Sequence, residues 1–207
     1  MSQRAGTTTA WTWLAACMLA AGFSLPGIAA HARNEPATAG KAPALLARMA
    51  GTWTVTQRMR PGADAKMIDL PPAVARRQLV GDAWIEEVMT PASAPASGQG
   101  AFTRTSFLNY NPVEKVYEYF SLDTRAPQQM RYASATMDAG RAAPPIKLKG
   151  GRFVAAQWGD ARNVAFDYRL EVGGVENDRQ TVRLYLTPAG PGGKEFLAFR
   201  YDYARKP

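Results

Sequence analysis

Cysteine and histidine are almost absent from this sequence, which has one of each among 207 residues, Cys17 and His31. Both lie within the first 32 residues, which we expect to be removed as a signal peptide, so the mature chain has no thiol and no imidazole. This excludes disulfides, cysteine nucleophiles and zinc sites of the usual Cys and His kind. It also excludes histidine-based catalytic triads and histidine-ligated haem.

The chain also lacks any motif for a metal ion bound through oxygen ligands alone, and nothing in it supports haem held by Tyr or Met. We therefore expect no metal site and no cofactor.

An uninterrupted apolar run of the roughly 20 residues that span a membrane is missing as well. Instead, Arg4 precedes an apolar stretch at 10–21, and Pro26 and Gly27 lead to the small-residue site at 30–32. This order is typical of a secretory signal peptide. We expect cleavage near Ala32 and a soluble periplasmic or secreted protein without a transmembrane span.

A second interpretation of the N-terminus depends on Cys17. The residues at 14–17 resemble the lipobox of bacterial lipoproteins, in which the cysteine is lipidated and becomes the new N-terminus. The apolar residues at 18–23 argue against it, because a lipid-linked cysteine is normally followed by a polar tether. A lipoprotein anchored through Cys17 stays the alternative.

Acidic residues are fewer than basic ones, 17 against 25, which gives a net charge of +8. Loss of the signal peptide removes Arg4 alone among the charged residues and lowers the net charge to +7. Such an excess favours contact with acidic polymers or anionic lipid surfaces. The basic residues are scattered, however, so we interpret the excess as an ordinary cationic surface.

Basic and aromatic residues interleave at 131–132, 183–185 and 200–203, as they do on surfaces that stack single-stranded nucleic acid. Alternation in a strand produces the same pattern, and no nucleic-acid motif is present. We expect no nucleic-acid partner, and the sequence indicates no particular partner protein.

Removing 32 of the 207 residues leaves 175, enough for one domain with a stable core. Residues 33–43 are rich in Pro, Ala and Gly and predict a disordered tether. Residues 44–207 form the predicted domain. It begins with a short helix at 44–50, where Leu45, Leu46 and Met49 have helical spacing, and this helix is expected to close one end of the domain.

From residue 52 onward, short alternating segments separated by turn residues predict an all-β, antiparallel barrel. The predicted strands are 52–60, 74–80, 84–89, 102–110, 115–122, 129–136, 146–149, 152–157, 164–172, 181–187 and 196–204. Of these eleven segments, we expect eight to ten to be barrel strands. The loops at 91–100 and 138–145 are expected to flank the entry to the interior.

Two segments mark the closure of this barrel. Gly51 and Trp53 begin the first long strand, and Arg205 ends the last one. If these strands pair antiparallel, Arg205 lies across the indole of Trp53, an arrangement that explains the residues as structural barrel closure.

Gly-x-Trp on the first strand with Arg on the last is the shared signature of the calycin superfamily, which includes lipocalins and nitrobindin-like barrels. The chain most resembles an uncharacterised secreted family of calycin-like barrels that carries only a domain-of-unknown-function label. The segments at 45–53, 84–87, 109–117 and 193–206 carry the resemblance. It implies a barrel able to enclose a small apolar ligand and no known catalytic activity. The chain departs from the haem-binding branch because it has no mature histidine.

Glu86 and Glu87 are consecutive on a predicted strand, so one of them must face the interior. A buried carboxylate needs a partner, for which Arg200, Arg104 or Arg131 are available. Such a group is either a polar anchor for a ligand, a general base with a raised pKa, or half of a structural ion pair. We favour the ion pair.

An aromatic and thioether set spans the neighbouring strands. With Glu87 it makes up our candidate ligand-binding cavity: Met89, Phe102, Phe107, Tyr117, Tyr119 and Met130, together with Phe120. Such side chains line ligand cavities, but they also fill solid cores.

We consider three hypotheses for the function. The first is a non-enzymatic protein that binds a small, mostly apolar ligand in a cavity of about 300 Å³ or more. The second is an envelope interaction or structural module with a solid barrel and an exposed apolar patch. The third is an enzyme based on carboxylate and tyrosine chemistry, with an inward glutamate beside a tyrosine hydroxyl.

Overall fold

The computed structural model describes residues 41–81, 83–93, 101–138 and 144–207. The predicted signal peptide at 1–32, most of the tether, and parts of the loops at 91–100 and 138–145 lie outside these residues. Within the described part, no helix combines the length and the apolar character needed to cross a membrane.

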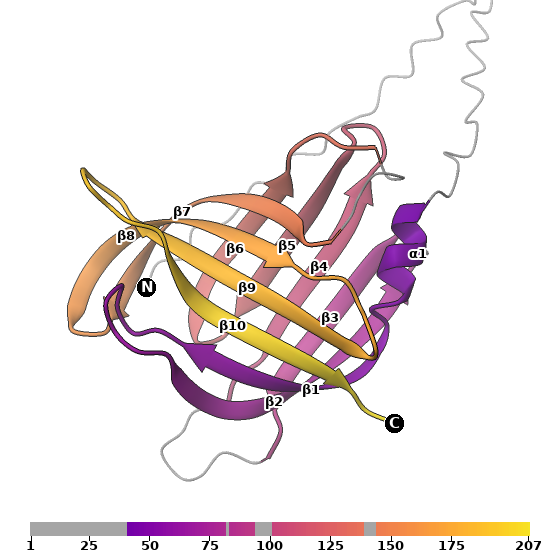
Figure 1. The fold of residues 1–207 in the computed structure, drawn as a ribbon, viewed down its shortest axis with the longest axis horizontal. Helices are drawn as coiled ribbons and strands as arrows, with labels where there is room; N and C mark the ends of the chain where they lie inside the picture. Colours follow the sequence, from indigo (N-terminus) through magenta and orange to yellow (C-terminus); the bar gives the residue numbers. More distant parts are fainter. Residues whose placement is uncertain (1–40, 82, 94–100, 139–143) are drawn as a thin grey trace, which may run out of the picture. The chain divides into compact units, whose positions relative to one another are not determined.

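The described residues form one short helix, α1 (Lys41–Ala47), and ten strands that close into an antiparallel barrel (Figure 1). The strands are β1 (Gly51–Met59), β2 (Ile68–Val80), β3 (Trp84–Pro91), β4 (Arg104–Asn111), β5 (Val116–Asp123), β6 (Ala126–Ser134), β7 (Ile146–Trp158), β8 (Ala161–Val172), β9 (Arg179–Pro188) and β10 (Phe196–Arg205). Each strand pairs with the next along the chain, and β10 pairs with β1.

The prediction of a closed antiparallel barrel is therefore confirmed. Ten strands exceed the eight of lipocalin barrels, so the architecture by itself does not assign the chain to the calycins.

The prediction wrongly separates 146–149 from 152–157. In the structure these residues belong to the single strand β7, which has an irregularity between Lys149 and Arg152. Gly150 suggests a turn in the sequence, but in the structure it leaves space for a neighbouring aromatic ring. A Cβ atom at Gly150 would lie 1.8 Å from the ring of Tyr168, which crosses the strand there. The missing side chain lets a neighbouring ring pack and does not end the strand.

The helix lies three residues earlier than predicted, and it includes the end of the predicted tether. Leu46 and Met49 are nevertheless both buried in the core. After Ala47 the backbone tightens, as Met49 N donates to Leu46 O at 2.8 Å, and this turn brings Met49 inward. The helix packs against β3 and β4 at the barrel end where β1 begins and β10 ends, which we call the helix end.

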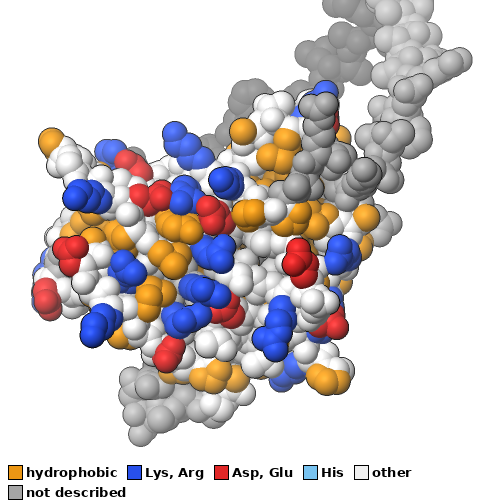
Figure 2. All heavy atoms as spheres, in the orientation of Figure 1, with side chains coloured by type: hydrophobic (Ala, Val, Ile, Leu, Met, Phe, Trp, Pro, Cys, Tyr) orange, Lys and Arg blue, Asp and Glu red, His pale blue; other side chains and the backbone are white. Residues whose placement is uncertain are grey.

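Side chains alternate between the two faces of the barrel wall. On β1, Trp53, Val55 and Gln57 are buried, whereas Thr54 and Thr56 are exposed. The outer face carries interspersed basic and acidic side chains, as Figure 2 shows for the face that includes β8, β9 and β10. Ion pairs such as Arg169 with Glu195, at 2.6 Å, link them, which is the ordinary mixed surface that the scattered charges predicted.

Candidate functional site

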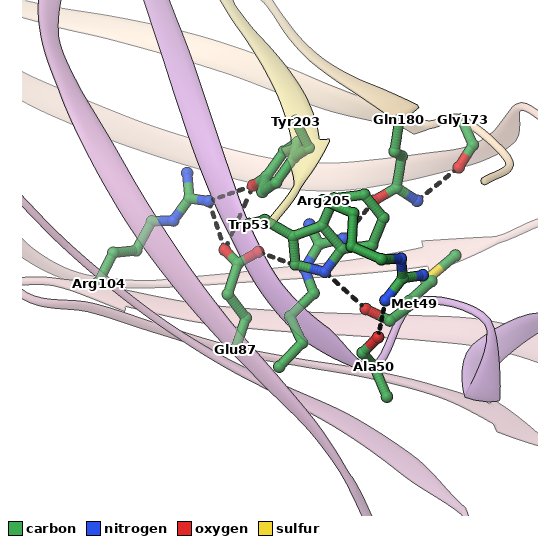
Figure 3. Close-up of polar contacts among 10 residues, drawn as sticks. Met49, Ala50, Trp53, Glu87, Arg104, Gly173, Gln180, Tyr203 and Arg205 are labelled. Carbon is green, nitrogen blue, oxygen red and sulfur yellow. Dashed lines mark hydrogen bonds and ion pairs between the residues drawn. The ribbon is translucent and has the colours of Figure 1, made fainter. Parts of the chain in front are cut away.

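Barrel closure brings Trp53 and Arg205 together, because they are direct partners in the β1–β10 ladder. The Arg205 guanidinium lies 4.2 Å from the centre of the indole, and the fully buried Trp53 donates from Nε1 to Met49 O at 3.0 Å. Arg205 also donates to the carbonyl of Ala50 (Figure 3). A further hydrogen bond joins Arg205 to the carbonyl of Arg48 at 2.7 Å. These contacts tie the last strand to the turn after α1.

Gly51 is required by the same contact. Its φ of +128° is unfavourable for residues with a side chain, and a Cβ atom would lie 2.4 Å from Arg205 Nη1. Gly51, Trp53 and Arg205 therefore form one structural unit that faces the turn after α1.

Glu87 is the inward member of the glutamate pair, and Glu86 faces outward, where it accepts a hydrogen bond from Gln78. Glu87 is 3% exposed and lies between two arginines. Arg77 Nε donates to Glu87 Oε2 at 2.7 Å, and Arg104 Nη2 donates to Oε1 at 2.6 Å. Arg104 is one of the predicted partners, whereas Arg77 is not. Arg200 and Arg131 lie elsewhere, beside Asp202 and Gln129.

Tyr203 and Gln180 complete this group, which we call the Glu87 cluster: Arg77, Glu87, Arg104, Gln180 and Tyr203. Figure 3 labels all of these residues except Arg77. The Tyr203 hydroxyl accepts from Arg104 Nη2 at 3.0 Å and donates to Glu87 Oε1 at 3.4 Å. Arg77 donates to Gln180 Oε1 and stacks 4.0 Å from the centre of the Tyr203 ring. Gln180 in turn donates to Gly173 O at 2.6 Å. The cluster thus joins β2, β3, β4, β9 and β10 across the interior.

The electrostatics of the cluster decide the protonation state of Glu87. Burial alone would raise the pKa of this carboxyl, but the ion pairs with Arg77 and Arg104 outweigh burial and lower its pKa to about 2. Glu87 is therefore ionised at neutral pH. A carboxylate held so firmly is a weak base, and this argues against the enzyme hypothesis, which needs a raised pKa.

The low pKa of Glu87 predicts acid sensitivity. The pKa of this carboxyl falls from its ordinary value of 4.5 to about 2 in the folded protein. The ionised Glu87 therefore stabilises the fold fully above about pH 4.5, and this contribution is lost as the pH falls toward 2. The difference corresponds to roughly 3 kcal/mol of unfolding free energy. Urea unfolding measured between pH 5 and pH 2 should show this loss in the wild type and a shallower one in Glu87→Gln. Equal slopes for the two proteins would contradict the ion-pair account.

An interior cavity of about 380 Å³ lies beside the cluster, toward the barrel end opposite α1. Its walls come from every strand except β3: Met59, Leu70, Arg104, Tyr119, Ser121, Asp123, Ala126, Gln128, Met130, Tyr132, Phe153, Trp158, Leu170, Val182, Leu184, Leu186, Phe199 and Tyr201, with Arg125 from the β5–β6 turn. Most of these side chains are apolar or aromatic. Arg104 belongs to both the cavity wall and the Glu87 cluster.

A continuous aromatic cluster surrounds much of this space. Tyr132 packs edge-on against Tyr119 and Tyr168, with ring centres 5.4 and 4.7 Å apart. On the other side, Trp158 packs against Phe166 and Phe199 at 5.6 and 5.7 Å. Such interlocked rings hold the wall in shape, because edge-to-face packing fixes the rings relative to one another.

Of the predicted cavity residues, the structure places Tyr119 and Met130 on the cavity. Glu87 does not line the cavity, but it is hydrogen-bonded to Arg104, which does. Met89 and Tyr117 are fully buried without lining the cavity. Phe102 packs under the guanidinium of Arg125, at 3.8 Å.

Phe107 does not face the interior. Ser106 and Leu108 on either side of it are buried, so the alternation of β4 places Phe107 on the outer face, and there it stacks with Phe120 at 6.5 Å. Phe107 therefore does not line the interior cavity.

The predicted entry loops also need correction. β3 ends and β4 begins at the barrel end that contains the cavity, whereas β6 ends and β7 begins at the helix end. In an antiparallel barrel, successive connections alternate between the two ends. These two connections lie at opposite ends, so they do not flank one entry.

No protein-family model and no curated protein matches the chain. Among the described residues there is also no group of three or more Asp, Glu, His or Cys side chains placed to hold a metal ion.

Proposed function

We propose that the protein is a calycin-like binding protein that holds a small, mostly apolar molecule inside its barrel. The observation that carries the proposal is the interior cavity of about 380 Å³ with its largely apolar and aromatic wall. Ligand sites of small molecules are typically about 300–1,000 Å³ in volume, with a few polar groups that orient the ligand. The resemblance to calycins supports the same proposal, as does the barrel topology.

The alternatives are less well supported. A solid barrel that serves only as an envelope interaction module predicts no cavity. The enzyme hypothesis needs a basic carboxylate, whereas the pKa of Glu87 is lowered to about 2 by its arginine partners, against the effect of burial. We also propose that binding takes place in the periplasm or outside the cell, after cleavage near Ala32 or on a lipid anchor at Cys17.

Partly filling the cavity should weaken binding. Leu184 faces the cavity, so Leu184→Trp should occupy part of it. The neutral fluorescent probe N-phenyl-1-naphthylamine should bind the wild type. Leu184→Trp should weaken its binding at least about tenfold, or about 1.4 kcal/mol, because the indole takes up volume that the probe needs. Fluorescence titration measures both.

Val154→Trp is the matched control, because Val154 is 48% exposed on β7, two strands away from β9. The same bulk on the outside should leave probe binding unchanged. Melting curves of both variants establish that they are folded. Equal probe binding by the wild type and a folded Leu184→Trp would contradict the proposal, as would a wild type that binds no probe.

A further inference from the structure

We propose that the ligand carries one acidic group of the carboxylate type and that Arg104 binds it, with the apolar part of the molecule against the opposite wall. This inference rests on the proposed function and names the chemical class of its ligand. Three features of the site support it. They are the excess of positive charge, the hydrogen-bond donors that Arg104 leaves unused, and the position of the apolar wall across the cavity from Arg104.

The charges around the cavity do not balance. Arg77, Glu87 and Arg104 are the buried charged side chains of the described residues. Asp123 and Arg125, at the rim, neutralise one another through a two-pronged ion pair of 2.9 and 2.6 Å. Three arginines thus face two carboxylates, and one positive charge remains in excess. A buried excess charge is costly, and an anionic ligand offsets that cost.

The tyrosines around the cavity do not supply the missing negative charge. Burial raises the pKa of Tyr119, Tyr132 and Tyr201, so their hydroxyls stay protonated at neutral pH. The same holds for Tyr203 in the Glu87 cluster, where burial is again the main cause of a raised pKa. They offer hydrogen bonds to a bound anion instead.

Arg104 has donors that the described residues leave unused. It is 7% exposed and lines the cavity. Its hydrogen bonds to described residues all come from Nη2, which reaches Glu87 and Tyr203. Its Nε is buried without a hydrogen-bond partner among the described residues. A guanidinium has five N–H donors in a planar fork that suits a carboxylate. Arg77, by contrast, is already used by Glu87 and Gln180.

The rest of the cavity wall is suited to an apolar tail. Leu170, Leu184, Phe153 and Trp158 lie on β7, β8 and β9, across the barrel from Arg104 on β4. A molecule with an acid at one end and a hydrocarbon body therefore matches both parts of the cavity. A cationic ligand is disfavoured by the excess positive charge, and a neutral one leaves that excess uncompensated.

The test compares two probes that differ only at the end group, decanoate and decanol, as competitors of N-phenyl-1-naphthylamine at neutral pH. In the wild type, decanoate should bind at least about tenfold more tightly than decanol, since a charge-assisted hydrogen bond is the difference. Arg104→Gln should reduce this ratio to about one and still bind the neutral probe. Arg131→Gln removes the same charge from the exposed outer face of β6, so it is the matched control and should keep the ratio.

A measurement on the wild type alone tests the same inference if the Arg104 variant does not fold. Decanoate should lose its advantage as the pH falls through the range of about 4 to 5 in which carboxylic acids are protonated. Glu87 stays ionised over this range because its pKa is about 2, and the pKa of Asp123 is also lowered, against burial, by its bonds to Arg125. Titration of the ligand, and not of these neighbours, then causes the change.

The outcomes separate the two proposals. If decanol competes as well as decanoate, or if folded Arg104→Gln keeps the preference, the acidic-ligand inference fails and the apolar-binding function stands. If neither compound displaces a bound probe, the inference also fails. If the wild type binds no probe and neither compound, the proposed function itself fails.

Discussion

Trp53→Ala should destabilise the barrel by about 3–5 kcal/mol, because it empties a fully buried site at the seam where the barrel closes. The indole packs edge-on against Tyr203, with ring centres 6.3 Å apart, and carries Arg205 on its face. Its loss also removes the hydrogen bond to Met49 O that holds the turn after α1. In a domain of this size, such a loss lowers the Tm by roughly 6–20 °C.

Trp84→Ala is the matched control for this change. Trp84 is 42% exposed at the start of β3, so truncating it should cost less than about 1 kcal/mol. Thermal and urea unfolding of the two purified variants measure the difference. A Trp53→Ala protein that melts within a degree or two of the wild type would show that the seam does not depend on this residue.

The barrel and its closure are predictable from the sequence because they depend on local signals. Alternation places the strands, and the pairing of the first strand with the last results from closure of an antiparallel sheet. Trp53 and Arg205 are indeed direct partners. The main error in strand number comes from Gly150, since a glycine that admits the ring of Tyr168 has the same sequence signal as one that forms a turn.

Arg77 is missed by the prediction although the register contains the information. Val80 and Trp84 are partners across the short turn between β2 and β3. Counting away from this turn along each strand pairs Gln78 with Glu86, and Arg77 with Glu87. Opposite charges facing one another across neighbouring strands are a favourable pair. A prediction that fixed the length of this turn would have found the partner of Glu87.

The aromatic set shows a different limit. Tyr119 and Phe120 are consecutive and so face opposite sides of the wall, which the sequence alone implies. The existence of the cavity is not implied in this way. It depends on how side chains from nine strands meet in the centre, and residues such as Trp158 and Phe199 reach it from strands far apart in the sequence. No local sequence pattern predicts that these side chains leave a cavity between them.

Glu87→Gln should cost about 3–5 kcal/mol at neutral pH, because it leaves two buried guanidinium groups without a counter-charge. The variant keeps the size of the side chain, so packing changes little and the loss reports on charge. Glu86→Gln is the matched control, since Glu86 is the next residue along β3 and faces outward beside Gln78. It should cost less than about 1 kcal/mol. Equal costs for the two variants in urea unfolding would contradict the description of the Glu87 cluster.

A triple variant, Arg77→Met with Glu87→Leu and Arg104→Met, separates stability from binding. Apolar side chains of similar size often replace a buried ion pair with little loss and sometimes with a gain, so this protein should recover most of the stability that Glu87→Gln loses. It should also lose the preference for decanoate over decanol while it still binds the neutral probe. The barrel would then fold without its interior charges, and their presence would be explained by the ligand. A triple variant that is no more stable than Glu87→Gln would instead make the cluster part of the fold itself.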